Sequence, residues 1–242
     1  MSEELAALGP FFALEFHTTG GASSPWRPMV ELVEPVEPVD GSSVLAERVA
    51  AVRAFLADGT GQETAAVELR VAASVVHLGL VARVVSPLFA LAVLHQGCGR
   101  VRAADLWWQP MLGSMFPLSL RESARDSGVG FADGVLAGVI AEFSAAATGF
   151  GVNEHILRGN VASALSGAAR TLTAARPDLR SGIRALITDL LAGPHLAGAG
   201  HFEPDAGFRR RSCCLIYRAA PDRQGALCGD CVLAAPHGPM DT

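Results

Sequence analysis

Four of the five cysteines in this chain of 242 residues lie within 19 residues near the C-terminus, and this crowding constrains the fold most. They are Cys213, Cys214, Cys228 and Cys231, in the pattern C-C-x13-C-x2-C. The polar turn at residues 221–225 can bring the first pair back beside the second. Two residues between Cys228 and Cys231 allow both sulfurs to face one metal. The spacing therefore predicts a metal site made by four thiolates.

The spacing leaves the metal open, because soft thiolates suit both zinc and iron-sulfur clusters. Tetrathiolate zinc sites usually use two C-x2-C pairs, and the adjacent Cys213 and Cys214 do not supply the second one. A two-iron cluster is wider, which eases that geometry. The acidic N-terminus, residues 1–5, does not have the pattern of an export signal. We therefore expect a cytoplasmic protein with reduced cysteines, in which disulfides are the weaker explanation.

Composition predicts a mainly α fold. Half of the residues are hydrophobic but only 6% are aromatic, which suits close-packed helices better than stacked strands. The net charge of -5 argues against a nucleic-acid partner. The most apolar stretch, residues 71–94, contains His77, Arg83, Ser86 and Pro87. We therefore expect no membrane span there and interpret this stretch as a buried helical hairpin.

Local signals divide the chain into expected elements. The expected helices begin at Ser42 or Ser43, at a Thr60–Glu63 capping box, at Ser86–Pro87, and near residues 134, 153 and 178. Residues 18–42 are expected to be extended, residues 101–120 to form a short β-hairpin, and residues from 195 onward to be loop. The prediction is a compact helical domain in residues 1–194, with a cysteine-rich, metal-binding segment in residues 195–242 packed on it.

The cysteine segment resembles the C-terminal motif of FhuF-like ferric siderophore reductases, where Cys-Cys, a loop and Cys-x-x-Cys follow in this order. Residues 156–165 resemble a helical family segment that usually has tryptophan where this chain has Arg158, and the following Gly159–Asn160 pair is kept. Residues 79–87 and the Trp107–Trp108 pair are also similar to actinobacterial members. The resemblance covers most of residues 65–234, with a longer loop between the cysteine pairs than is common in the family.

The resemblance implies a 2Fe-2S cluster on the four cysteines and the reduction of ferric siderophores. One electron opens such a chelate, because ferrous iron binds hard oxygen donors far less strongly than ferric iron. The sequence contains no P-loop and no G-x-G-x-x-G after a strand, so we expect an external ferredoxin or flavoprotein donor. Two alternatives are a zinc-stabilised binding module, in which the cysteines staple the C-terminal tail, and an iron-sulfur redox sensor.

Arginines near the cysteines are candidates for docking a substrate or a donor, with a solvated arginine face as the alternative. They are Arg209, Arg210, Arg211, Arg218 and Arg223.

Other side chains are weighed against ordinary structural roles. His77 is expected in the core, whereas His195, His201 and His237 are the alternative metal ligands. Trp107 and Trp108 are expected to stabilise the hairpin, Asn160 to make a local turn contact, and Cys98 to be a buried free thiol; Glu15 and His17 are too few to make a metal site.

Overall fold

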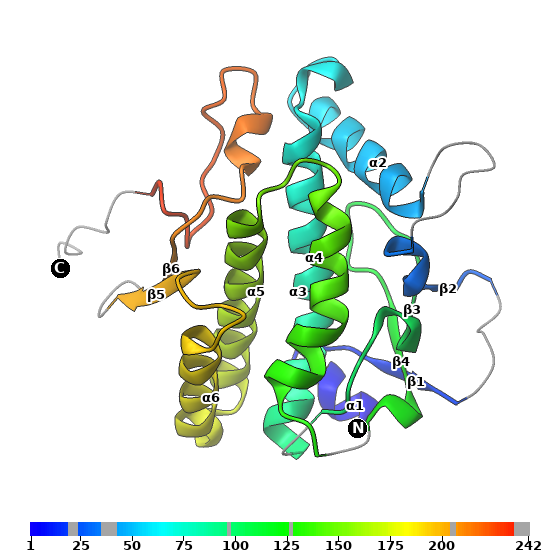
Figure 1. Cartoon of the computed structure of the whole chain (residues 1–242), viewed down its shortest axis with the longest axis vertical. Helices are drawn as coiled ribbons and strands as arrows, with labels where there is room; N and C mark the ends of the chain where they lie inside the picture. Colours follow the sequence, from blue (N-terminus) through cyan, green and yellow to red (C-terminus); the bar gives the residue numbers. More distant parts are fainter. Residues whose placement is uncertain (19–23, 35–42, 96–97, 126–127, 204–206, 235–242) are drawn as a thin grey trace.

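The computed structural model describes residues 1–18, 24–34, 43–95, 98–125, 128–203 and 207–234 (Figure 1). The fold is mainly α, as the composition predicts. The α-helices are α1 (Ser2–Ala6), α2 (Val44–Gly59), α3 (Leu69–His95), α4 (Ala141–Thr148), α5 (Glu154–Ala175) and α6 (Arg180–Ala192). The strands are β1 (Glu15–His17), β2 (Arg27–Pro28), β3 (Leu106–Trp108), β4 (Leu118–Arg121), β5 (Gly200–Glu203) and β6 (Gly207–Arg210).

Helix α3 lies at the centre of the molecule and packs against α2, α4 and, most extensively, α5 (Figure 1). By length and composition alone α3 could cross a membrane. However, 72% of its most apolar window is buried inside the molecule, and core helices pass the same test. Its burial on several sides follows from a sequence that is apolar all round, with no single hydrophobic stripe.

The predicted hairpin of helices is wrong, because α3 runs unbroken through Pro87. The Ser86 hydroxyl donates to the Ala82 carbonyl at 2.7 Å within the helix and does not cap a new one. Thr60 likewise closes α2 by donating to the Leu56 carbonyl at 2.8 Å, so the predicted capping box does not form. Packing along the whole of α3 outweighs the hydrogen bond that the proline removes.

Other helix predictions are confirmed. The Ser43 hydroxyl accepts from the Ala46 N–H at 3.1 Å and caps α2, while the Asn153 side chain accepts from the His155 N–H at 2.7 Å and caps α5. The segment before α4 is a π-helix, Ala132–Ile140, that α4 continues. Within it Gly138 lies so close to Val101 that a Cβ would be 2.3 Å from the Val101 carbonyl oxygen.

The predicted β-hairpin is confirmed as the antiparallel pair β3 and β4, within a four-stranded sheet of order β1-β4-β3-β2. Trp108 is buried in β3 and packs edge-on against Phe116, as expected for hairpin stabilisation. Glu15 and His17 belong to β1, where the His17 ring bonds Ser119 at 2.8 Å. Parts of the predicted extended segment lie outside the described residues; the described part contains β2 and a 3-10 turn, Met29–Leu32.

The sequence predicted that the chain after α6 is all loop, and this prediction is wrong. Strands β5 and β6 form a second hairpin, which lies beside α5 and leads into the cysteines (Figure 1). The aromatic rings of Phe202 and Phe208 pack edge-on across it, with centroids 5.6 Å apart. The division of the chain at residue 194 stays a prediction.

Candidate metal centre

The structure brings the four clustered cysteines together. The Cys214 and Cys228 sulfurs are 3.2 Å apart, and the Cys213 and Cys231 sulfurs are 3.7 Å apart. Cys214 and Cys231 are buried, whereas Cys213 and Cys228 are partly exposed. The centre therefore has an inner side against the protein and an outer side near solvent.

The thirteen residues between the cysteine pairs fold back through a 3-10 turn, Ile216–Ala219, and a polar turn. Leu215 adopts a left-handed conformation with φ of 71°, and its N–H donates to the Cys213 sulfur at 3.3 Å. The Gly225 N–H donates to the Tyr217 carbonyl at 2.9 Å and closes the loop. A Cβ at Gly225 would approach that same oxygen to 2.9 Å, so the close approach requires glycine. The predicted return of the chain by this turn is confirmed.

The sulfur arrangement is compatible with a two-iron group. The thiols form two close pairs, and a 2Fe-2S cluster held by four thiolates distributes its ligands over two irons. Among the described residues, no group of three or more His, Cys, Asp or Glu side chains is arranged to hold one metal ion. The choice between the cluster and zinc therefore rests on the comparison with known families.

The Cys214 thiol is the one that gives up its proton most readily. Hydrogen bonds from Cys213 and Cys228, helped by the Ile216 N–H and the Arg210 charge, lower the Cys214 pKa to about 2. The same hydrogen bonds to Cys214 raise the pKa of Cys213 and of Cys228. The thiols therefore share protons as a set, as closely spaced titrating groups do.

Arg210 lies beneath this set with its side chain fully buried. One guanidinium nitrogen is 3.1 Å from the Asp230 carboxylate, and another donates to the Asn160 side-chain oxygen at 3.3 Å. Burial lowers the pKa of Arg210, but Asp230 and then Cys214 and Cys228 outweigh burial and raise it. A permanent positive charge therefore faces the thiolates from the protein side.

Asn160 connects this arginine to the helical core. Its amide donates to the Ser74 carbonyl and hydroxyl on α3, both at 3.2 Å, and its nitrogen is 3.5 Å from the His77 ring. His77 in turn bonds the Ser144 hydroxyl of α4 at 3.1 Å. Burial lowers the pKa of His77 to about 4, so the ring is neutral at pH 7. A buried polar chain thus runs from the cysteines through three helices.

Gly159 lets the cysteine segment approach α5 closely. A Cβ at Gly159 would lie 2.0 Å from the Ser212 hydroxyl oxygen. That hydroxyl donates to the His155 carbonyl at 3.1 Å, and the His155 ring donates to the Arg211 carbonyl at 3.2 Å. The Gly159–Asn160 pair is therefore the place on α5 where the cysteine segment is seated, and the local turn role predicted for Asn160 is wrong.

Comparison with protein families decides what this segment is. Residues 210–233 match the family model described as the FhuF 2Fe-2S C-terminal domain. The cysteine segment, residues 210–233, is similar to this domain, and we call it the FhuF-type domain. The match supports the expected FhuF-like ferric siderophore reductase family, and the family name indicates a 2Fe-2S cluster. No curated protein and no solved structure matches the chain.

Most arginines of the FhuF-type domain hold the domain itself. Docking by Arg210 is wrong because its side chain is fully buried. Arg209 pairs with Glu203 at 2.8 Å and donates to the Cys231 carbonyl at 3.0 Å, so it ties β6 to the second cysteine pair. Arg218 pairs with Glu68 at 2.5 Å ahead of α3, and Arg223 lies 3.7 Å from the same carboxylate. Arg211 is exposed, and its docking role stays a prediction.

Among the described residues, no hydrogen bond joins a histidine or Cys98 to any of the four clustered thiols. Cys98 is buried, and burial raises its pKa to about 11, in agreement with the expected free thiol. His201 is 3.6 Å from Glu203 two residues along β5, and His237 lies outside the described residues. His195 is half-buried after α6. Sequence reasoning noted Ser212 and Asp230 only as part of the family resemblance, gave no role to either or to His155, and had only the small residue at Gly159 as a signal of the close approach on α5.

Proposed function

We propose that the protein is a cytoplasmic ferric siderophore reductase whose FhuF-type domain binds a 2Fe-2S cluster through Cys213, Cys214, Cys228 and Cys231. The observation that carries the proposal is the convergence of four sulfurs in two close pairs inside the segment that matches the FhuF 2Fe-2S model. When bound, the cluster supplies single electrons: one electron from a reduced protein donor converts chelated Fe(III) to Fe(II), which the oxygen ligands release.

The residues around the thiols support this role. Cys214 and Cys231 are buried, so the protein shields one side of the site from water. The Arg210 charge offsets the negative charge of the thiolates and of an added electron, which favours the reduced state. The N–H groups of Leu215 and Ile216 point at sulfurs and act in the same direction. These residues prepare the site to accept an electron at an accessible potential.

The outer side of the site suits a protein donor. Leu227, Val232 and Leu233, which flank the second cysteine pair, are 42%, 40% and 51% exposed. Arg211 and Arg223 are exposed close to the cysteines in the sequence. A small apolar patch with cations beside it matches the surface that a short-lived complex with an acidic ferredoxin or a flavoprotein requires.

Anaerobic purification tests the proposal. We expect a coloured protein with two irons and two acid-labile sulfides per chain, whose visible bands bleach with dithionite and recover on addition of a ferric tris-hydroxamate. One Fe(II), trapped by a ferrous chelator, should form per recovered cluster. Cys228→Ser is expected to lose the bands.

Two outcomes would overturn the proposal. A colourless protein that contains zinc and no sulfide would favour the zinc-stabilised binding module. A reduced cluster that oxygen oxidises but ferric chelates do not would favour the redox sensor.

A further inference from the structure

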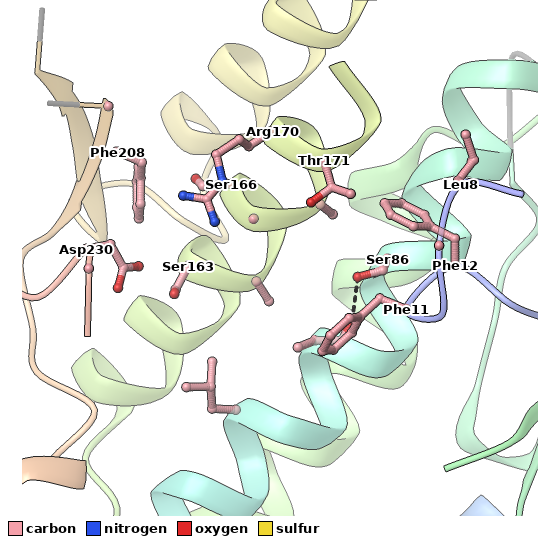
Figure 2. A pocket seen from close by; sticks show the side chains of 18 of the residues that line it. Leu8, Phe11, Phe12, Ser86, Ser163, Ser166, Arg170, Thr171, Phe208 and Asp230 are labelled. Carbon is pink, nitrogen blue, oxygen red and sulfur yellow. Dashed lines mark hydrogen bonds between the residues drawn. The ribbon is translucent and has the colours of Figure 1, made fainter. Parts of the chain in front are cut away.

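A cavity of about 860 Å³ lies directly beside the FhuF-type domain (Figure 2). Its walls come from the N-terminal loop at residues 8–12, from α3, from α5, from the β5–β6 hairpin, and from Gly229 and Asp230. The volume is within the range of sites that enclose a small-molecule ligand. Nothing described so far assigns it a role.

The cavity reaches the residues between two of the proposed cluster ligands. Gly229 and Asp230, which line it, are the two residues between Cys228 and Cys231. A molecule in the cavity therefore lies against the backbone that joins two cysteines. Such a position gives an electron a short path out of the site.

The charges of the cavity favour a ligand with electron-rich oxygens. Arg170 of α5 lines it and forms no ion pair with a described residue. Asp230 also lines the cavity, on the side of the cysteine segment, but the buried Arg210, 3.1 Å away, offsets its charge. Figure 2 shows Phe208 and Asp230 on one side of the cavity, Phe11 and Ser86 on the other, and Ser163, Arg170 and Thr171 along α5 between them.

In the described part of the chain, the cavity also contains one buried polar group without a protein partner and two partly exposed aromatic rings. The Ser166 hydroxyl is buried and has no hydrogen-bond partner among the described residues, although it lies in the wall. Buried hydroxyls normally have a partner, so this one indicates a ligand or water. Phe11 and Phe202 are about half exposed at the cavity, where they can cover the hydrocarbon part of a ligand.

We propose that this cavity binds the ferric chelate, with Arg170 against its oxygen donors and Phe11, Phe202 and Phe208 against its hydrocarbon backbone. The inference rests on the proposed reductase function and adds to it the place where the substrate binds. The chelate then receives its electron from the Gly229–Asp230 side of the FhuF-type domain.

Gly167 offers a direct test, because it lies in α5 at the cavity and a Cβ there meets no atom within 4 Å. Gly167→Phe should fill the cavity without a backbone clash. Gly182→Phe on α6, where a Cβ also meets nothing within 4 Å, is the matched control. Arg170→Glu tests the charge of the cavity. Its control is Arg184→Glu, at an exposed position on α6.

The probe is the gallium(III) complex of a tris-hydroxamate siderophore, which binds like the ferric complex but does not accept the electron. Calorimetry on the cluster-loaded protein should show binding that Gly167→Phe and Arg170→Glu each weaken by about tenfold or more, and that the two controls leave unchanged. Reoxidation by the ferric complex should slow in the same two variants, while reoxidation by hexacyanoferrate(III) should not.

The outcomes separate the two proposals. The cavity proposal is wrong if both cavity variants bind the gallium complex as the wild type does. It is also wrong if the wild-type protein reduces the ferric complex without binding the gallium complex. Neither result contradicts the proposed reductase function. A wild-type cluster that ferric complexes do not reoxidise would overturn the reductase, and the cavity proposal with it.

Discussion

The protein buries two arginines, one in the helical body and one beneath the cysteines, and their surroundings are opposite. Arg83 of α3 donates only to backbone carbonyls, those of Phe116 at 2.8 Å, Ala13 at 2.6 Å and Phe11 at 3.2 Å. Burial lowers its pKa to about 10. Arg210 faces the Asp230 carboxylate and the Cys214 sulfur, and its pKa is raised. Among the described residues, Arg83 forms no ion pair.

This difference separates a structural cation from one that belongs to the site. The Arg83 charge is balanced by carbonyl dipoles and by the Phe116 ring, whose centroid is 5.8 Å away, and it ties the N-terminal loop and the β3–β4 loop to α3. The Arg210 charge is balanced by anions, and the charge of the thiolate set changes when a cluster there gains an electron. Arg83 should therefore govern the stability of the whole fold, whereas Arg210 should govern cluster assembly and potential.

Arg83→Met should cause the largest loss of stability. It removes the donor from one buried and two partly buried carbonyls, which costs about 3–5 kcal/mol of unfolding free energy. Urea denaturation followed by circular dichroism measures the loss. Arg83→Lys keeps the charge and part of the hydrogen bonding, so it should lose less. A Met variant as stable as the wild type would show that these carbonyls find other partners and that Arg83 is not a structural tie.

Lowering the pH should reduce the stability of the fold near Arg210 by protonating His77. Asn160 connects these two residues, because it contacts the His77 ring and accepts a hydrogen bond from Arg210. Burial lowers the folded pKa of His77 from 6.5 to about 4. The stability that a neutral His77 contributes is therefore fully present above pH 6.5 and is lost as the pH falls toward 4, by about 3 kcal/mol. Denaturation midpoints across this window should fall more steeply in the wild type than in His77→Gln. Equal slopes would contradict a buried, neutral ring.

The two arginines also show what the sequence could and could not predict. The cysteine spacing correctly predicted that the thiols converge, because the turn residues and the C-x2-C pair act locally. Arg210 stands in a run of three arginines, which indicated a solvated face. Its burial depends on Asp230, 20 residues later, and on Asn160, 50 residues earlier, and no local pattern carries that information.

The prediction of a helical hairpin in residues 71–94 was wrong for a related reason. Ser86 and Pro87 have the local pattern of a helix start, and that signal is correct for an exposed helix. Here α2, α4 and α5 pack against α3, and burial stabilises the continuous helix more than the proline destabilises it. Gly159 was noticed as part of a motif, yet its purpose is a contact with Ser212, which only the packed structure reveals.

Arg210→Met should have a moderate effect that is confined to the FhuF-type domain. It leaves the partly buried Asp230 beside the thiolates without its cation, a cost of about 2–3 kcal/mol for that domain. We expect less iron and sulfide per chain, a more negative reduction potential in the clusters that do form, and unchanged helical content by circular dichroism.

Arg210→Lys should recover part of the potential, because it restores the charge without the bond to Asn160. A potential equal to that of the wild type in Arg210→Met would show that this charge does not act on the cluster.

Gly159→Ala should have the smallest effect of the set, and it tests whether the cysteine segment sits on α5 as described. The added Cβ meets the Ser212 hydroxyl, so the segment must shift at a cost of about 1–3 kcal/mol. Ser212→Ala removes that oxygen but also its hydrogen bond to His155, so alone it should lose about 1 kcal/mol. In the double variant the clash is gone. The combined loss of cluster content and stability should therefore be smaller than the sum of the two single losses.

Gly167→Ala on the same helix controls for the change of glycine to alanine, since a Cβ there meets nothing and the helix should gain about 0.5–1 kcal/mol. Strict additivity between Gly159→Ala and Ser212→Ala would mean that the two residues do not touch. The cysteine segment would then be held on α5 by Arg210 and by the two hydrogen bonds that join His155 to Arg211 and Ser212, without a steric contact at Gly159. Coupling between the two positions would instead show that steric fit at Gly159 and charge at Arg210 hold the segment independently, one setting its distance from α5 and the other its electrostatics.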